Sequence, residues 1–144
     1  MKTVQDLLQA KGSDVYSVRP DASVYEALTL MAERNVGAVL VMDEQGRLAG
    51  ILSERDYARK VVLKGQTSRD TPVRNIMTEA VLCVPAGTSI ESCMAVMTER
   101  RIRHLPIIGD GRVIGVVSIG DVGKALIAEQ GHVISQLEQY ICGR

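Results

Sequence analysis

The chain has 144 residues, of which 46% are apolar and 24% charged, and its 17 basic and 17 acidic side chains give a formal net charge of zero. This composition excludes a disordered chain and a membrane-spanning one, and the zero net charge argues against bulk binding of nucleic acid. The N-terminal MKTVQDLLQAKG lacks an uninterrupted apolar run and a cleavage site, so we expect a cytoplasmic protein. The three cysteines, Cys83, Cys93 and Cys142, form no C-x-x-C pair, so we expect reduced thiols and no metal site.

The sequence repeats itself with a shift of 66 residues, which becomes 65 where the loop DEQG (43–46) shortens to GDG (109–111). The pattern predicts an N-terminal helix over 1–14, a first repeat over 15–66, a linker and lead-in over 67–80, a second repeat over 81–130 and a C-terminal helix over 131–144. The identical pairs are Val15/Val81, Val18/Val84, Ser23/Ser89, Met31/Met97, Glu33/Glu99, Arg34/Arg100, Gly46/Gly111, Arg47/Arg112, Gly50/Gly115, Ser53/Ser118 and Asp56/Asp121.

Each repeat begins with a short extended segment, over 15–18 and 81–84, followed by a turn that contains proline. An amphipathic helix comes next, because apolar residues fall at i, i+3, i+4 and i+7. The spacing of Ser23 with Glu26, and of Thr88 with Glu91, predicts a capping box at the start of each helix. The apolar positions are Val24, Ala27, Leu28 and Met31 in one repeat and Ile90, Cys93, Met94 and Met97 in the other.

The second part of each repeat reads as a β-hairpin, over 38–42 with 48–52 and over 105–108 with 113–117. A second helix should follow, over 54–64 before Gly65 and over 119–130 before Gly131. Each repeat is therefore β-α-β-β-α, and the fold class is α/β (α+β). The polar stretch GQTSRDTP (65–72) is expected to link the repeats.

The two terminal helices each carry an apolar face that the repeats do not account for. The C-terminal helix could cover its own core or pair across a dimer, and the presence of two such faces favours pairing into a homodimer. The residues on these faces are Val4, Leu7 and Leu8 at one end and Val133, Ile134, Leu137, Tyr140 and Ile141 at the other.

The segment GILSERD (50–56) recurs as GVVSIGD (115–121) and places a serine at the end of a strand and an aspartate on the first turn of the next helix. A carboxylate can accept hydrogen bonds from both hydroxyls of a ribose, while a serine hydroxyl and a helix N-terminus favour a phosphate. Ser-x-x-Asp is also the spacing of an ordinary capping box. Its occurrence at equivalent places in two matching frames favours a binding role, and the same residues can serve both purposes.

The repeats resemble the CBS domain family over about Val15 to Gln130. The motifs that carry the resemblance are 50–56 and 115–121 together with RIRHLP (101–106) and VRNIMT (73–78). The resemblance implies that the two repeats pack about a pseudo-two-fold axis, with a cleft for an adenosine compound on each side. It also implies that two such pairs associate into a disc-like dimer.

By the same resemblance, Asp56 and Asp121 would bind ribose hydroxyls, and Ser53 and Ser118 would hold ribose or phosphate. Arg103 and His104 would meet the phosphate of the nucleotide bound at Asp56. Their counterparts in the first repeat, glycine and alanine at 37 and 38, carry no charge, so the two clefts are not expected to be equivalent. The expected contacts of the adenine or its surroundings are Tyr16, Val36, Ile51, Leu82, Ile102 and Val116.

The function that follows is a regulatory module that senses adenine nucleotides and signals to an effector protein. AMP, ADP or ATP is expected at Asp56, while the Asp121 cleft could be empty, bind a neutral adenosyl compound or admit a dinucleotide such as NAD. We expect no enzyme, since the sequence has no nucleophile elbow with a Ser-His-Asp arrangement and no paired-carboxylate motif. The alternatives are a structural dimer without ligand, a binder of S-adenosylmethionine, a hydrolase or transferase, and a nucleic-acid regulator.

Overall fold

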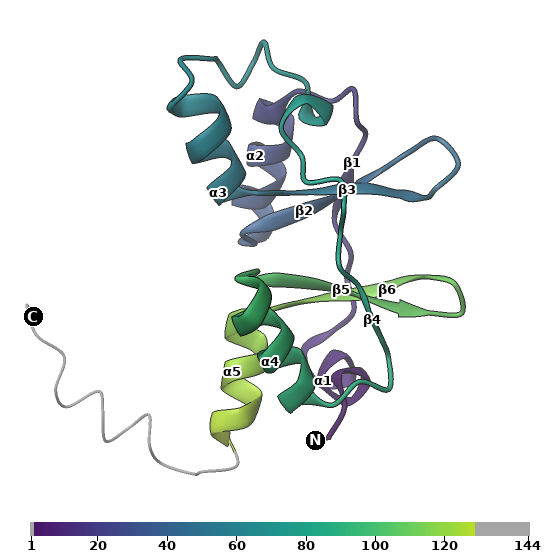
Figure 1. Ribbon diagram of the computed structural model, residues 1–144. Coiled ribbons are helices and arrows are strands. Elements are labelled where there is room, and N and C mark those ends of the chain that lie inside the picture. The colour runs from purple at the N-terminus through teal and green to yellow at the C-terminus, as the bar shows by residue number, and fades with distance from the viewer. Residues whose placement is uncertain (1, 129–144) are drawn as a thin grey trace, which may run out of the picture. The chain divides into compact units, whose positions relative to one another are not determined.

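The computed structural model describes residues 2–128, which form two units of the same design. One unit comprises Asp14–Leu82, and the other combines the N-terminal segment through Ser13 with the chain from Cys83 (Figure 1). No helix within residues 2–128 is long and apolar enough to cross a membrane. The helix expected over 131–144, with its apolar face, lies outside the described residues, as do Gly131 and Cys142.

The first unit confirms the β-α-β-β-α order of the first repeat and encloses its own apolar core. Its strands pair in the order β1-β2-β3, with β1 parallel to β2 and β2 antiparallel to β3. The sheet's apolar residues, such as Val39, Val41 and Leu52, pack with Val24, Ala27 and Met31 of the amphipathic helix. The elements are β1 (Ser17–Val18), α2 (Val24–Arg34), β2 (Ala38–Met42), β3 (Leu48–Ser53), α3 (Glu54–Tyr57), η1 (Ala58–Val62) and η2 (Val73–Asn75).

The second unit repeats this arrangement and adds an N-terminal helix. Its strands pair in the order β4-β5-β6 with the same parallel and antiparallel senses. The core contains Ile90, Leu105 and Ile107. The elements are α1 (Val4–Lys11), β4 (Val84–Pro85), α4 (Ile90–Arg100), β5 (His104–Gly109), β6 (Arg112–Ser118) and α5 (Ile119–Ala128).

The starts of α2 and α4 show which sequence signals fix the helices. Ser23 caps α2, and its side chain accepts a hydrogen bond from the N–H of Glu26, as expected. The expectation for α4 was wrong by one residue, because the cap is Ser89, which accepts from Ser92, and not Thr88. Ser89 is the counterpart of Ser23 at the 66-residue shift, so the repeat alignment located the cap better than the capping-box spacing did.

The helix expected over 54–64 is α-helical only as far as Tyr57 and continues as a π-helical turn, η1. The N–H of Leu63 bonds the carbonyl of Ala58, five residues back, as a π-helix requires. The wider turn puts Val61 into the core at 1% exposure and leaves Leu63 77% exposed. Apolar spacing assumes 3.6 residues per turn and cannot reveal such an insertion.

The segment that precedes each repeat in sequence packs onto the unit formed around the other repeat. In the first unit, the N–H of Val73 donates to the carbonyl of Ala22 at 2.8 Å. In the second unit, the N–H of Val4 donates to the carbonyl of Thr88, also at 2.8 Å. Val4 and Val73 are thus equivalent, and α1 lies alongside the second repeat (Figure 1).

The expected linker at 65–72 is likewise held against the first unit. The carbonyl of Thr71 accepts from Val24, and that of Ser68 accepts from Tyr25, so this segment satisfies two backbone N–H groups in the first turn of α2. Thr71 is 5% exposed, and its hydroxyl donates to the carbonyl of Thr67 at 2.7 Å. The segment is therefore anchored by its own backbone.

Two glycines allow the lead-in segments to approach the hairpins closely. A Cβ atom placed on Gly50 would lie 2.8 Å from both the sulfur of Met77 and the carbonyl oxygen of Thr78. A Cβ atom on Gly115 would lie 2.6 Å from a methyl carbon of Leu8. Both glycines are needed because a neighbouring segment fills the space of the missing side chain.

Candidate functional site

The end of β3 and the start of α3 form the first candidate site, here called the first corner and defined by Ser53 and Asp56. Ser53 ends the strand and caps the helix. The Asp56 N–H donates to the Ser53 hydroxyl oxygen at 3.2 Å, while Asp56 Oδ2 accepts from the N–H and the hydroxyl of Ser53 at 3.0 and 3.1 Å. The capping box is therefore formed in full.

The second corner, Ser118 with Asp121, has the same geometry at the junction of β6 and α5. The N–H of Ser118 donates to Asp121 Oδ2 at 2.8 Å, and the N–H of Asp121 donates to the Ser118 hydroxyl at 3.0 Å. In each corner the first N–H group of the helix is already hydrogen-bonded within the protein. Glu54 N–H donates to the carbonyl of Gly37, and Ile119 N–H donates to the carbonyl of Arg103. The corners therefore present pre-oriented carboxylates, with fewer open N–H groups than the sequence suggested.

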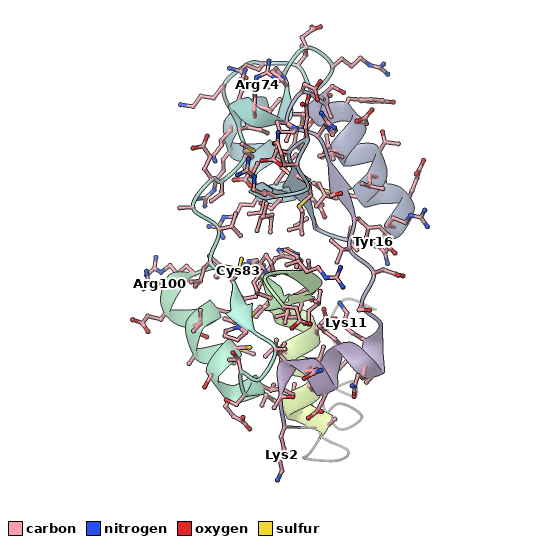
Figure 2. All side chains as sticks on the ribbon, turned by 90° about the vertical axis from the view of Figure 1, so that its right-hand side faces the viewer. Lys2, Lys11, Tyr16, Arg74, Cys83 and Arg100 are labelled. Atoms are coloured by element: carbon pink, nitrogen blue, oxygen red, sulfur yellow. The ribbon has the colours of Figure 1, made fainter. Side chains whose placement is uncertain are left out.

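Each carboxylate meets a lysine that sequence reasoning missed. Lys60 Nζ lies 3.2 Å from Asp56 Oδ1 and donates to the carbonyl of Ile76 at 3.0 Å. Lys11 stands at the end of α1 (Figure 2). Its Nζ lies 3.0 Å from Asp121 Oδ2 and donates to the carbonyl of Val116 at 2.9 Å. Lys60 stands four residues after Asp56 on one helical segment, a spacing that signals a pair, whereas Lys11 is 110 residues from Asp121 and has no local signal.

Tyr16 and Val36 lie in the first unit, at the two ends of the segment that includes α2. The guanidinium carbon of Arg34 lies 5.3 Å from the centre of the Tyr16 ring, and the Tyr16 hydroxyl donates to Asp14. Val36 is half-buried and lines a hollow of about 340 Å³, to which Glu54 of the first helical turn also contributes. Its other lining residues are Leu28, Met31, Ala32, Asn35 and Gly37.

The hairpin residues expected near the ligand are half-buried and equivalent in the two units. Ile51 exchanges backbone hydrogen bonds with Thr78 at 3.0 and 2.9 Å, so the lead-in segment covers this edge of β3. Val116 is the matching residue of β6. Its carbonyl accepts a hydrogen bond from the Lys11 side chain, where that of Ile51 accepts one from the Thr78 N–H. Ile102 packs against the second core, and Leu82 is 40% exposed.

Arg103 and His104 lie beside the second corner. His104 is the first residue of β5 and pairs in register with Ser118, while the side chain of Arg103 is exposed. Residues 37 and 38 hold the same places beside the first corner, where Ala38 pairs with Ser53. The two corners therefore differ in the charge of their own neighbours. That Arg103 and His104 serve a ligand bound at Asp56 stays a prediction.

A sequence profile of the CBS domain matches residues 4–63 and 73–128. The chain belongs to the CBS domain family. The mitochondrial CBS domain-containing protein CBSX3 of Arabidopsis thaliana is 40% identical over 149 residues, which cover 98% of this chain and 72% of that protein. A solved protein with CBS domains from Burkholderia ambifaria MC40-6, described as a candidate signal-transduction protein, is 47% identical with a TM-score of 0.87, and the match covers 92% of this chain and 98% of that one.

The CBS domain pair of MJ0100, solved with 5-methylthioadenosine and S-adenosyl-L-methionine, has the same fold at 23% identity. Its TM-score is 0.78, and the match covers 88% of this chain and 97% of that one. Two matched repeats make this chain a CBS-domain pair protein, whose relatives are described as CBS-domain and signalling proteins.

The surroundings of the Asp121 carboxylate shift its pKa. Burial by itself would raise the pKa of Asp121, but the hydrogen bond from the Ser118 N–H and the contact with Lys11 outweigh it, so the pKa lies below its ordinary value of 3.8. The carboxylate is therefore ionised at neutral pH and is stabilised more in the folded chain than in the unfolded one.

This lowered pKa predicts how the stability of the second CBS unit depends on pH. The unfolded carboxyl takes up a proton near pH 3.8, above the pH at which the folded one does. Its contribution to the free energy of unfolding is thus complete above 3.8 and is lost as the pH falls through the folded value. We expect the difference in unfolding free energy between the wild type and Asp121→Asn, from urea titrations, to be constant from pH 7 to 5 and to shrink below about 4. A difference that stays constant down to pH 2 would contradict this assignment.

Proposed function

We propose that this CBS pair is a regulatory module that binds adenine nucleotides, with the ribose held at Asp56 or Asp121, and passes the bound state to an effector protein. The observation that carries the proposal is the recurrence of one pre-oriented corner at equivalent places in two units. In each, a serine holds Oδ2 of the aspartate, and the aspartate side chain stays partly exposed, by 15% for Asp56 and 31% for Asp121.

The chemistry of the corner suits a ribose better than a bare phosphate. Its carboxylate can accept hydrogen bonds from vicinal hydroxyls, and hydrogen bonds to a charged acceptor contribute about 1.5–3 kcal/mol each. A free phosphate would face a negative charge in each corner. The adenosyl ligands of MJ0100 support an adenosine compound as the ligand class in this family.

The choice of nucleotide rests on the groups around the corners. We propose that Arg103 and His104 meet the phosphate of AMP, ADP or ATP, since a guanidinium binds phosphate oxygens in pairs. The hollow of about 340 Å³ beside Val36, which has both apolar and polar lining residues, is of the size that binds small molecules and is proposed for the adenine. NAD and S-adenosylmethionine remain alternatives, as does a homodimer that binds no ligand.

The test is thermal melting with AMP, ADP, ATP, NAD, NADH and S-adenosylmethionine. A true ligand at a hundred times its dissociation constant should stabilise the protein by about 2.7 kcal/mol. Because Asp56→Ala and Asp121→Ala also remove the carboxylate that accepts the serine N–H in the capping box, the ligand-induced shift of each variant is compared with its own ligand-free state. We expect the variant of the occupied corner to weaken binding about tenfold or more.

The matched control is Asp21→Ala, because Asp21 is exposed and lies outside both corners. It should bind as the wild type does. No shift with any of the six compounds would favour the structural dimer, and consumption of a bound nucleotide on prolonged incubation would favour an enzyme. Binding that survives in the Asp56→Ala, Asp121→Ala double variant would show that the corners are not the site.

A further inference from the structure

The carboxylate of the second corner, on Asp121, is hydrogen-bonded to a residue of the N-terminal helix α1. Oδ2 accepts from the N–H of Ser118 at 2.8 Å and from Lys11 Nζ at 3.0 Å. A carboxylate oxygen has two lone pairs, so these two donors fill Oδ2. Both of these hydrogen bonds are made to Oδ2, so Oδ1 is the oxygen that a ligand hydroxyl can reach without displacing either donor.

A ribose whose two hydroxyls bind one carboxylate oxygen each must therefore replace one donor on Oδ2. The Ser118 N–H is held by the capping box and belongs to the strand end, so it cannot leave without opening α5. The Lys11 side chain is long and 35% exposed, so its ammonium can turn into water when it gives up its bonds to Asp121 and to the carbonyl of Val116. We therefore expect Lys11, and not the Ser118 N–H, to leave Oδ2 when the ribose binds.

The first corner lacks this link to another helix. Lys60 meets Asp56 through Oδ1 and stands on the same helical segment, four residues away. Its departure would give up the hydrogen bond to the carbonyl of Ile76 but would release no separate α-helix. Lys11, in contrast, is the last residue of α1 and precedes Gly12, whose N–H donates to Leu8 at the helix end.

We propose that Lys11 competes with the ribose for Asp121, so that a nucleoside bound at the second corner releases the C-terminal end of α1. This inference rests on the proposed function. It adds that α1 is the segment whose conformation changes when a nucleoside binds at the second corner. The ligand it concerns is the nucleoside part, whatever phosphate or thioether the compound carries. Linkage requires the reverse effect too, so a loosened α1 must raise the affinity for the nucleoside.

The first experiment titrates adenosine by calorimetry in an Asp56→Ala background, where only the second corner retains its carboxylate. Lys11→Met removes the ammonium and keeps the length of the side chain. It should tighten adenosine binding about two- to fivefold, the range expected from the energy of a partly exposed ion pair. Lys2→Met is the matched control, because Lys2 lies in the same segment with an exposed side chain that points away (Figure 2), and it should change nothing.

The second experiment follows hydrogen exchange of the Gly12 N–H in the same background. Saturating adenosine should speed this exchange, and Lys11→Met should exchange fast with or without adenosine. In the ligand-free protein, Asp121→Asn should speed it as well, since it weakens the contact with Lys11.

The outcomes separate the two proposals. Adenosine binding that Lys11→Met leaves unchanged or weakens would overturn the competition while leaving the nucleotide-binding function standing. Exchange at Gly12 that adenosine does not speed would overturn the release of α1. If adenosine binds neither form at any concentration tested, both the competition and the ribose role of Asp121 are wrong.

Discussion

Replacing Leu7 by alanine is expected to lower the free energy of unfolding by about 2–5 kcal/mol, the usual cost of emptying a leucine site in a core. Leu7 is 3% exposed and shares its core with Val4, Leu8 and the strands of the second repeat. The effect would show that α1 is an integral part of that unit. Urea unfolding followed by circular dichroism measures it.

The matched control for this truncation is Leu63→Ala, since Leu63 is 77% exposed at the end of the π-helical turn. A surface substitution of this kind should change the free energy of unfolding by less than about 0.5 kcal/mol. If Leu7→Ala were as mild as Leu63→Ala, α1 would not be docked in solution. Its proposed link to Asp121 would then lose its structural basis.

Gly50→Ala is expected to lower the free energy of unfolding by about 1–3 kcal/mol, and Gly115→Ala is expected to lower it by less. Both glycines are buried and occupy equivalent positions in the two repeats. The new methyl group on residue 50 would press on the carbonyl oxygen of Thr78, which is fixed by a 3.0 Å hydrogen bond from Ile51. At residue 115 it meets only the side chain of Leu8, which can rotate. Thermal or urea unfolding of the two variants tests this order.

Gly87→Ala is the control for both, because a Cβ atom there would meet nothing within 4 Å. Combining Leu8→Ala with Gly115→Ala should cost less than the sum of the single changes, since each makes room for the other. Strict additivity would mean that Leu8 does not fill the space above Gly115. Equal costs at residues 50 and 115 would contradict the distinction between a backbone obstacle and a side-chain one.

Most of each repeat could be predicted from the sequence because its signals are local. Apolar spacing located α2 and α4, the turn loops located both hairpins, and the internal repeat fixed their equivalence. The Ser-x-x-Asp pattern likewise identified both corners, since a cap and its third residue are neighbours on one helical turn. Where the local rule assumed a regular helix, at the π-helical turn after Tyr57, it failed.

The tertiary structure alone decided which lead-in segment covers which repeat, and therefore which lysine meets which carboxylate. The apolar face of α1 at Val4, Leu7 and Leu8, which the sequence analysis assigned to dimer pairing, is buried in the core of the second repeat. The Lys11–Asp121 contact joins residues 110 positions apart. Such a pair is fixed by the packing of Leu8 over Gly115, not by the propensity of either segment. Local sequence determines elements and caps, whereas long-range burial determines their neighbours, because only the folded chain brings distant apolar faces together.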